Sequence, residues 1–416
     1  MPSENTIRLS QCEKPSVAVY TRTFLTASMT FVYRQLCGVA DLFDPIVLTT
    51  KQDQEDRFPF TPIYVMSDDR KIENSRNFAS RVYRWTKKQI TGNYATLSRS
   101  QILSWTDVMR RKNVKLIHAH FGPDGLHMLP IAEELGIPLL VTFHGYDASS
   151  IIHNRVYLRH LRRLFDYAHI ICVSQHMANN LYLYGAVPSK TDIHYIGAPV
   201  EEFDVVERES IKHKVEQQKT LTFLQISNFV EKKGHEYTIQ AFHRFLPSYP
   251  NSQLVFAGDG PTRLQIEKLC NNLGLNDQVS FLGKVAKPKV IDLMRQADVF
   301  LHHSVTARNG DQEGIPTVLM EAMATGLPII STYHSGIPEL IENGVDGFLI
   351  LERDVDEYTR RMIDILESGE EMGKRSRKKI EEQFNIKIQN KILAKIYKDV
   401  IRGRSNIIGS CKKQSV

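Results

Sequence analysis

The segment 311–342 constrains the fold and the chemistry of this chain more strongly than any other. It reads DQEGIPTVLMEAMATGLPIISTYHSGIPELIE, a Gly/Pro turn that runs into a helix whose only charge is Glu321. A helix that is apolar on nearly every side is buried in its domain. A lone carboxylate on such a helix is costly unless donors satisfy it, so we expect Glu321 to face groups such as sugar or ribose hydroxyls.

The start of this helix has the features of an anion site. If Pro316 takes the first helical position, which proline favours, Ile315 is the N-cap. Isoleucine has no side-chain oxygen for the free N–H groups of Thr317 and Val318. Free N–H groups and the positive end of the helix dipole favour a bound anion, and phosphate is the most common anion that fits.

The two carboxylates of this segment also indicate a family. Glu313 and Glu321 are separated by seven residues, in EGIPTVLME, and are followed by GLPIIST and SGIPELI. The run resembles the E-x7-E segment of the retaining nucleotide-sugar glycosyltransferases of family four, in their exopolysaccharide or colanic-acid-type branch. The resemblance implies that Glu313 contacts the transferred sugar, that Glu321 holds the ribose, and that the residues from Gly314 to Val318 bind the donor. The alternative is a buried helix whose Glu321 is satisfied by protein groups.

Length and composition bound the class of protein. A chain of 416 residues is too long to fold around one ordinary hydrophobic core, so we expect two domains. The 42% of hydrophobic and 24% of charged residues are typical of a soluble globular protein. No apolar run reaches the ~20 residues of a membrane helix, and the N-terminus lacks the apolar core of a signal peptide, so we expect a cytoplasmic protein. The five scattered cysteines indicate neither disulfides nor a structural zinc.

A basic stretch between Arg70 and Lys115 contains twelve Lys and Arg and only two acids. Such a stretch attracts an anionic surface. Tyr83, Trp85 and Trp105 lie within it, and amphipathic rings of this kind favour the inner face of a membrane over nucleic acid as the partner. An ordinary solvated helical face is an equally open alternative.

The remainder of the chain alternates strands and helices with short Gly/Pro joints. This order indicates parallel α/β units. We expect strands at 16–20, 45–50, 114–119, 138–143, 169–173, 191–195, 221–226, 253–257, 279–282, 299–302 and 329–332. We expect helices at 76–104, 122–135, 234–246 and 261–273, besides the one that carries Glu321.

The segment GAPVEEFDV after Ile196 shows no periodicity and indicates a linker between two halves. We therefore predict an α/β protein with two doubly wound, Rossmann-like domains, 14–197 and 207–383, that face each other across a cleft. The family resemblance names this arrangement GT-B, with acceptor binding in the first domain and nucleotide-sugar binding in the second. It also implies that the helix 384–402 crosses back onto the first domain, and the polar tail 403–416 is expected to be disordered.

Two candidate residues follow the strand 138–143. His144 and Asp147 lie in TFHGYD, where side chains project at the carboxyl end of the sheet. The string is similar to the family segment whose His lies beside the donor phosphate and sugar, with a structural histidine as the alternative. For His118 and His120, after the preceding strand, structural and functional roles are equally open.

The turn after the strand 221–226 reads SNFVEKKG and is similar to the family turn G-R-x-x-x-x-K-G. In the family its Arg and Lys neutralise the leaving diphosphate. Lys233 matches the Lys, but Asn228 replaces the Arg, so the helix N-terminus or another basic residue must supply charge. Ordinary surface lysines are the alternative.

Two further positions concern the nucleotide. Gly258, in AGDGP, lets the backbone approach a ligand, although a G-x-G serves equally in a tight turn. Val285, in FLGKV, matches the family region that meets the base through main-chain groups, so the base is not predicted. No Asp-x-Asp pair stands in the candidate site segments to indicate a metal, and no second carboxylate there would serve as a nucleophile.

Together these features predict a retaining glycosyltransferase that moves a sugar from a nucleotide diphosphate sugar to a glycan acceptor, lipid-linked, in polysaccharide biosynthesis. Glu313, His144 and Lys233 would carry the chemistry, with no metal or other cofactor. Two alternatives are a nucleotide-sugar epimerase on the same scaffold and a non-catalytic member of a polysaccharide assembly complex.

Overall fold

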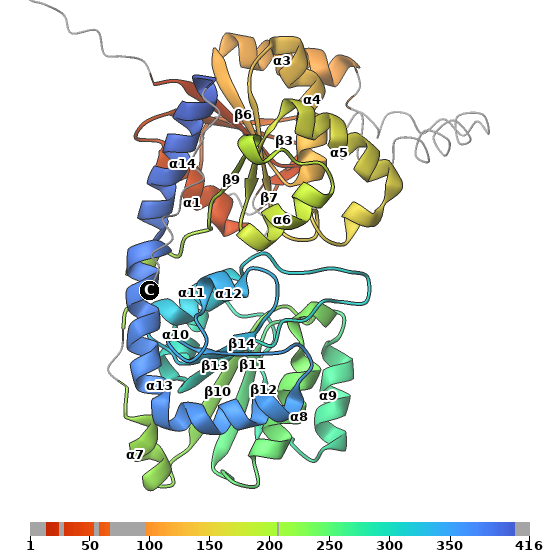
Figure 1. Cartoon of the computed structure of the whole chain (residues 1–416). Helices are drawn as coiled ribbons and strands as arrows, with labels where there is room; N and C mark the ends of the chain where they lie inside the picture. The colour runs from red at the N-terminus through yellow and green to blue at the C-terminus, as the bar shows by residue number, and fades with distance from the viewer. Residues whose placement is uncertain are drawn as a thin grey trace, which may run out of the picture.

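The chain folds around two separate parallel sheets, drawn one above the other in Figure 1. This computed structural model describes residues 14–24, 29–53, 58–66, 97, 99–205 and 208–403. The upper sheet has seven strands in the order β5-β3-β1-β6-β7-β8-β9, and the lower has six in the order β12-β11-β10-β13-β14-β15. The predicted pair of doubly wound α/β domains is therefore confirmed.

The first sheet is built from strands whose residues are mostly apolar. Its strands are β1 (Ser16–Tyr20), β3 (Asp44–Thr49), β5 (Ile63–Val65), β6 (Val114–His120), β7 (Leu139–Phe143), β8 (His169–Cys172) and β9 (Thr191–Ile193). Its helices are α1 (Thr30–Val39), α3 (Arg99–Arg111), α4 (Gly122–Leu135), α5 (Arg155–Tyr167) and α6 (Gln175–Leu183). Every residue of β1 and β7 is buried, as expected for strands covered by helices on both faces. The short strands β2 (Thr23–Phe24) and β4 (Lys51–Gln52) form a separate pair.

The second sheet repeats this construction. Its strands are β10 (Leu221–Ile226), β11 (Ser252–Ala257), β12 (Val279–Phe281), β13 (Val299–Leu301), β14 (Ile329–Thr332) and β15 (Phe348–Ile350). Its helices are α7 (Ile211–Glu216), α8 (His235–Phe245), α9 (Arg263–Asn272), α10 (Lys287–Gln296), α11 (Thr317–Ala324), α12 (Ile337–Leu340) and α13 (Val355–Gln383). All neighbouring strands in these two sheets pair in parallel.

Each sheet has one point at which the strand order reverses direction. In the first sheet this point lies between β1 and β6, and in the second between β10 and β13. Ligands of open α/β sheets bind outside the carboxyl ends of the strands at such a point. A ligand site is therefore expected in the loops that follow these four strands.

Two chain segments run side by side where the domains join. The backbone N–H of Ala198 donates to the Phe384 carbonyl at 2.7 Å, and the N–H of Ile386 donates to the Ala198 carbonyl at 2.8 Å. A Cβ on Gly197 would lie 2.4 Å from the Ile386 Cα, so only glycine permits this approach. The segment 197–202 and the start of α14 thus run side by side as the two chain segments that connect the domains.

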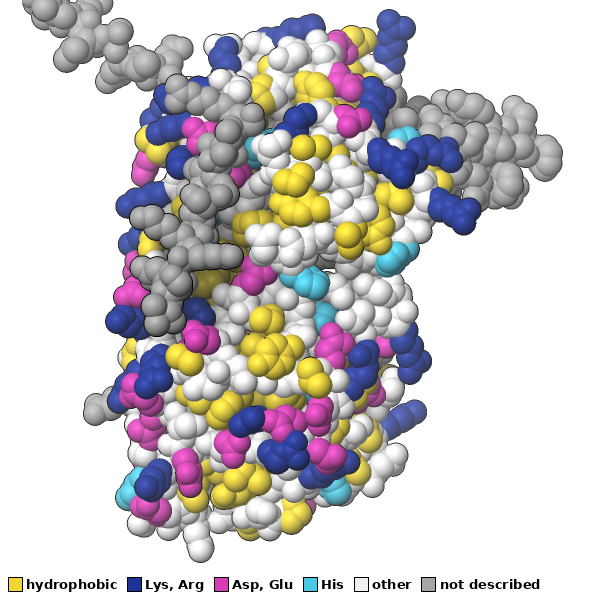
Figure 2. All heavy atoms as spheres, in the orientation of Figure 1, with side chains coloured by type: hydrophobic (Ala, Val, Ile, Leu, Met, Phe, Trp, Pro, Cys, Tyr) yellow, Lys and Arg dark blue, Asp and Glu magenta, His cyan; other side chains and the backbone are white. Residues whose placement is uncertain are grey.

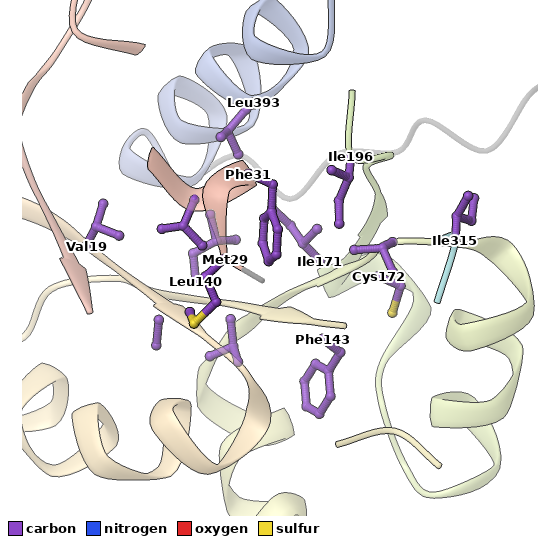
Figure 3. Packing of buried hydrophobic residues seen from close by; sticks show 14 of the residues in the cluster. Val19, Met29, Phe31, Leu140, Phe143, Ile171, Cys172, Ile196, Ile315 and Leu393 are labelled. Carbon is purple, nitrogen blue, oxygen red and sulfur yellow. The ribbon is translucent and has the colours of Figure 1, made fainter. Parts of the chain in front are cut away.

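The last helix, α14 (Ile386–Ile401), leaves the second domain and packs against α1 and β6 of the first, as Figure 1 shows in blue. Its Tyr397 hydroxyl lies 2.6 Å from His118 Nδ1, and the other ring nitrogen of His118 lies 2.7 Å from the Thr142 hydroxyl. Figure 3 shows Leu393 of α14 above the cluster that contains Phe31 and Leu140. Both ring nitrogens of His118 therefore have partners within the fold, which favours the structural role over the functional one.

Several predictions fall outside the described residues. They are most of the helix predicted over 76–104, the basic and aromatic residues from Arg70 to Lys88, and nearly all of the tail 403–416; the end of that predicted helix lies in α3. Among the described residues, no helix is both long and apolar enough to cross a membrane.

Candidate active site

Glu313 and Lys233 meet at the switch point of the second sheet. Lys233 ends the turn after β10, Glu313 lies in the loop after β13, and Lys233 Nζ is 2.9 Å from the Glu313 carboxylate. Both side chains are nearly buried, with 13% and 11% exposed. Burial would raise the pKa of Glu313, but the ammonium groups of Lys233 and Lys232 outweigh it and lower that pKa to about 2. The sequence-predicted sugar and phosphate residues are thus brought together as an ion pair.

The backbone of Glu313 is fixed by residues that sequence reasoning missed. Its N–H donates to His334 Nε2 at 3.0 Å, and its carbonyl accepts from the Ser335 hydroxyl at 2.7 Å. Because Nε2 accepts, His334 carries its proton on Nδ1, which lies 2.6 Å from the Glu352 carboxylate. His334 and Ser335 lie within the segment 311–342, in the string STYHSG. Glu352 lies outside that segment, and the strand β15, which precedes it, places it near the site.

Lys233 is held by a tight turn. The next residue, Gly234, has φ +58°, and a Cβ there would lie 1.9 Å from the His303 carbonyl oxygen. Glycine therefore lets the turn pack against the end of β13. Lys233 Nζ also lies 3.4 Å from His302 Nε2. Burial, with Lys233 nearby, holds the pKa of His302 well below its usual range, so this ring is neutral and accepts.

The start of α11 differs from the prediction by one residue. Pro316, not Ile315, is the N-cap, because its ψ of 120° is extended and the helix begins at Thr317. The Pro316 carbonyl accepts from the Leu319 N–H, and no side chain caps this end. The first N–H groups, those of Thr317 and Val318, still point out of the helix end, and Thr317 is exposed. The helix start can therefore receive an anion as expected.

Glu321 lies on α11 and has two cations near it. Burial raises its pKa, and Arg34 and Lys287 oppose that shift. Arg34 comes from α1 of the first domain and Lys287 begins α10 of the second. Both also pair with Glu202 in the connection between the domains. Sequence reasoning allowed for another basic residue but did not identify these two, because they come from distant elements.

His144 lies across from this loop, in the first domain. Its Nε2 is 3.1 Å from His120 Nδ1, and its ring packs against Phe31 and Phe121 with centroids 4.8 and 4.6 Å away. Its Nδ1 is buried without a hydrogen-bond partner. A Cβ on Gly314 would lie 2.6 Å from the His144 carbonyl oxygen, so the two loops touch. The predicted His144 and Glu313 loops are thus neighbours, and burial keeps the pKa of His144 well below its usual range.

Asp147 does not face the site as a ligand-binding residue, which corrects the prediction. It is fully buried, and its carboxylate accepts from the backbone N–H groups of Gly122, His144 and Gly145 at 2.9 to 3.0 Å. Because the side chain is completely buried, neither oxygen faces the cleft. Asp147 therefore positions the His144 loop.

The remaining predicted residues surround the turn of Lys233. Asn228 is exposed beside it, and a Cβ on Gly258, whose φ is +143°, would lie 1.9 Å from the Ser227 carbonyl oxygen. Gly258 thus supports the turn by close packing. Val285 is half-buried and packs against the larger core cluster. Within the part of the chain that the structure describes, no three metal-binding side chains gather.

The chain matches two family models. Residues 40–202 match the model described as Glycosyltransferase Family 4, and residues 206–383 match that described as Glycosyl transferases group 1. The junction between the matches falls on the connection between the two sheets.

Curated relatives and solved structures agree with these matches. The chain is 32% identical to the putative colanic acid biosynthesis glycosyltransferase WcaL of Salmonella typhimurium over 68% of this chain and 70% of that protein. It is 29% identical to WcaL of Escherichia coli over 91% of this chain and 98% of that protein.

Solved structures share the fold. The chain matches Anabaena HepE in complex with UDP and glucose with a TM-score of 0.72 and 18% identity, over 92% of this chain and 100% of that one. It also matches WaaG, a glycosyltransferase involved in lipopolysaccharide biosynthesis, with a TM-score of 0.61, 16% identity, and coverage of 93% and 100%. With its two sheets and the Glu313, Lys233 and α11 arrangement at the switch point of the second, this chain belongs to the group 1 glycosyltransferases of family 4 and has the GT-B fold.

Proposed function

We propose that this glycosyltransferase moves a hexose from a nucleoside diphosphate sugar to a hydroxyl of a growing, lipid-linked glycan, with retention of the anomeric configuration. The observation that carries the proposal is the Lys233–Glu313 pair beside the open N-terminus of α11. A cation and free N–H groups suit a leaving diphosphate, and a neighbouring carboxylate suits the sugar hydroxyls and the positive charge that develops on the sugar.

We propose retention from the resemblance of the segment that carries Glu313 and Glu321 to that of retaining family-four enzymes, and the carboxylates near the site bear on how it would occur. Glu313 is engaged by Lys233, and Asp147 is engaged by backbone N–H groups. Neither is placed as a free nucleophile for a covalent intermediate. Attack on the same face as the leaving group, with a phosphate oxygen taking the acceptor proton, agrees with this arrangement. The reaction would need no metal.

Uridine diphosphate sugars are the first donors to try, because solved relatives contain UDP, and UDP-glucose in the case of HepE. The polysaccharide role is supported by relatives named for colanic acid and amylovoran biosynthesis. The purified protein is incubated with a panel of nucleotide sugars and a lipid-linked glycan extract, and release of nucleoside diphosphate is followed. Conversion of the donor into an isomer would indicate an epimerase instead, and binding without consumption would indicate a non-catalytic member.

We also propose that the protein acts in the cytoplasm, as a peripheral protein on the inner face of the membrane. Most of the basic stretch that suggested this lies outside the described residues, but α5 supplies independent support. Its exposed Arg155, Arg159 and Arg162 share one face, and Figure 2 shows a group of Lys and Arg side chains over the side of the upper domain where Figure 1 draws α5. Such a face suits anionic lipid headgroups.

A further inference from the structure

The loop that carries Glu313 is attached to two residues that have no part in the proposed contacts with the donor, His334 and Glu352. His334 follows β14 and Glu352 follows β15, which are neighbouring strands of the second sheet. The His334 side chain is completely buried, and that of Glu352 is 21% exposed. Two strand ends therefore present a histidine and a carboxylate to the same loop.

The imidazole of His334 is held in one tautomer from both sides. The Glu313 N–H donates to Nε2 at 3.0 Å, and Glu352 Oε1 lies 2.6 Å from Nδ1. Burial would raise the pKa of Glu352, but hydrogen bonds from His334 and Thr306 outweigh it and lower that pKa to about 2. An ionised carboxylate only accepts hydrogen bonds, so the ring proton lies on Nδ1 and Nε2 is free to accept. Glu352 thus keeps the ring in the state that can hold the Glu313 backbone.

Glu352 also holds an earlier part of the same loop. Its carboxylate accepts from the Thr306 backbone N–H at 2.9 Å and from the Thr306 hydroxyl at 3.1 Å. The Gln312 side-chain amide donates to that hydroxyl at 3.1 Å, directly before Glu313 in the chain. Because one carboxylate serves both parts of the loop, a change at Glu352 would move Glu313 relative to Lys233.

The backbone beside each member of the pair is strained. Ser335 has φ +48° and Arg353 has φ +67°, a left-handed conformation that residues other than glycine rarely adopt. The Ser335 hydroxyl donates to the Glu313 carbonyl at 2.7 Å, and the Arg353 N–H donates to His303 Nε2 at 2.9 Å. Such strain persists where the surroundings enforce it, and it clusters at functional sites. Its position next to both His334 and Glu352 favours a functional role for the pair.

From this geometry we infer that Glu352 and His334 are positioning residues of the transfer reaction, which hold the Glu313 carboxylate where it contacts the transferred sugar. Glu352 sets the tautomer of His334, and His334 fixes the Glu313 backbone. The inference rests on the proposed function, in which the diphosphate and the ribose are bound by other residues. A change in the pair should therefore lower the rate of transfer and spare nucleotide binding.

Glu352→Gln tests the pair with little change in volume. The carboxylate accepts from His334 on one oxygen and from the Thr306 N–H on the other. Glutamine has one acceptor oxygen, so its amide group must oppose one of these donors, or the ring proton must move to Nε2 and oppose the Glu313 N–H. We expect kcat to fall about tenfold to a hundredfold, as for a misplaced reacting group. Affinity for the nucleoside diphosphate that wild type releases should stay within about twofold.

Glu357→Gln is the matched control for this variant. The Glu357 side chain is also 21% exposed and also forms ion pairs, but with Arg360 and Arg361 on α13. Its kcat should equal that of wild type. An equal loss of kcat in both variants, or an unchanged kcat in Glu352→Gln, would overturn the inference.

Two replacements of His334 separate its hydrogen bonds from its bulk. His334→Ala removes both bonds, whereas His334→Gln keeps one donor and one acceptor. His334→Ala should lose transfer as Glu352→Gln does, and His334→Gln should transfer faster than His334→Ala. Equal rates in the two would overturn the inference.

Action through Glu313 is tested in the Glu313→Ala background. There Glu352→Gln should lower the residual transfer by less than about twofold, because the carboxylate that the pair positions is already gone. A further loss as large as in wild type would show a role unrelated to Glu313 and overturn the inference.

The tautomer can be read without turnover from long-range ¹H–¹⁵N spectra of the full-length protein. The imidazole signal that disappears in His334→Gln should show the Nδ1–H tautomer in wild type and lose that state in Glu352→Gln. An Nε2–H tautomer in wild type would overturn the inference. A wild-type protein that shows the Nδ1–H tautomer but transfers sugar from no donor would instead count against the proposed function.

Discussion

Lys233 and Glu313 hold each other at 2.9 Å between the ends of β10 and β13, and both are nearly buried. Without a donor, each charge is therefore satisfied by the other. In the proposed reaction, a diphosphate that binds Lys233 would compete with Glu313 for this ammonium and would free the carboxylate to contact the sugar. The first predictions separate these two proposed contacts.

Glu321→Gln should weaken binding of the bare nucleoside diphosphate. A carboxylate that accepts from ribose hydroxyls makes charge-assisted bonds of about 1.5–3 kcal/mol, so affinity should fall roughly tenfold or more. Calorimetry with UDP measures this directly. Unchanged affinity in a folded variant would show that Glu321 serves only as counter-charge for Arg34 and Lys287.

Glu313→Ala should leave the affinity for UDP unchanged or raise it, because the substitution frees Lys233 for the phosphate. Transfer should nevertheless fall by at least about tenfold, since an electrostatic contact to the reacting sugar is lost. UDP calorimetry and product release are measured on the same preparation. An equal loss of UDP binding and of transfer would contradict this division of roles.

Lys233→Ala should weaken UDP binding by about 1.5–3 kcal/mol, because it removes a charge-assisted contact to phosphate. Lys232→Ala is the control: Lys232 pairs with Asp311 and with the Gln312 carbonyl at 3.1 and 3.3 Å, and it lies farther from Glu313, at 4.0 Å, than Lys233 does. Its removal should change UDP affinity by far less. If both variants bind UDP as tightly as wild type, the turn after β10 is not the diphosphate clamp.

The triple variant Arg155→Ser, Arg159→Ser, Arg162→Ser should sediment less with vesicles that contain anionic lipid. Each basic residue near such a surface contributes about 1 kcal/mol at low screening. A triple variant of α13, Lys374→Ser, Arg375→Ser, Lys378→Ser, removes the same formal charge elsewhere and should bind like wild type. Equal losses in the two triples would indicate a response to net charge alone.

Tyr397→Phe should destabilise the protein by about 1–3 kcal/mol, because the substitution leaves a buried His118 nitrogen without its partner. Urea unfolding measures the change. Tyr249→Phe, at a half-buried position of the second domain, is the control and should have little effect. No loss in Tyr397→Phe would show that apolar packing of α14, and not this hydrogen bond, attaches the helix to the first domain.

The sequence by itself predicted most strands of both sheets and the residues at their ends, but not β15 or the long helix α13. The strand 329–332 was predicted with the bounds that the structure has, and the helix predicted over 384–402 spans Ile386–Ile401, because apolar periodicity and Gly or Pro joints act over a few residues. Glu313, Glu321 and Lys233 could also be predicted as candidate site residues, since each lies within a short, continuous motif.

Only the tertiary structure decided which of these side chains meet and which are already occupied. Asp147 was a candidate beside His144, and the role of His118 was open. Backbone N–H groups satisfy Asp147, and Tyr397 and Thr142 satisfy His118. Arg34 and Glu352 approach the site from elements far away in the chain, and Phe121 is held in a strained conformation by its neighbours. Such contacts form when separate units pack together, so no local pattern in the sequence records them.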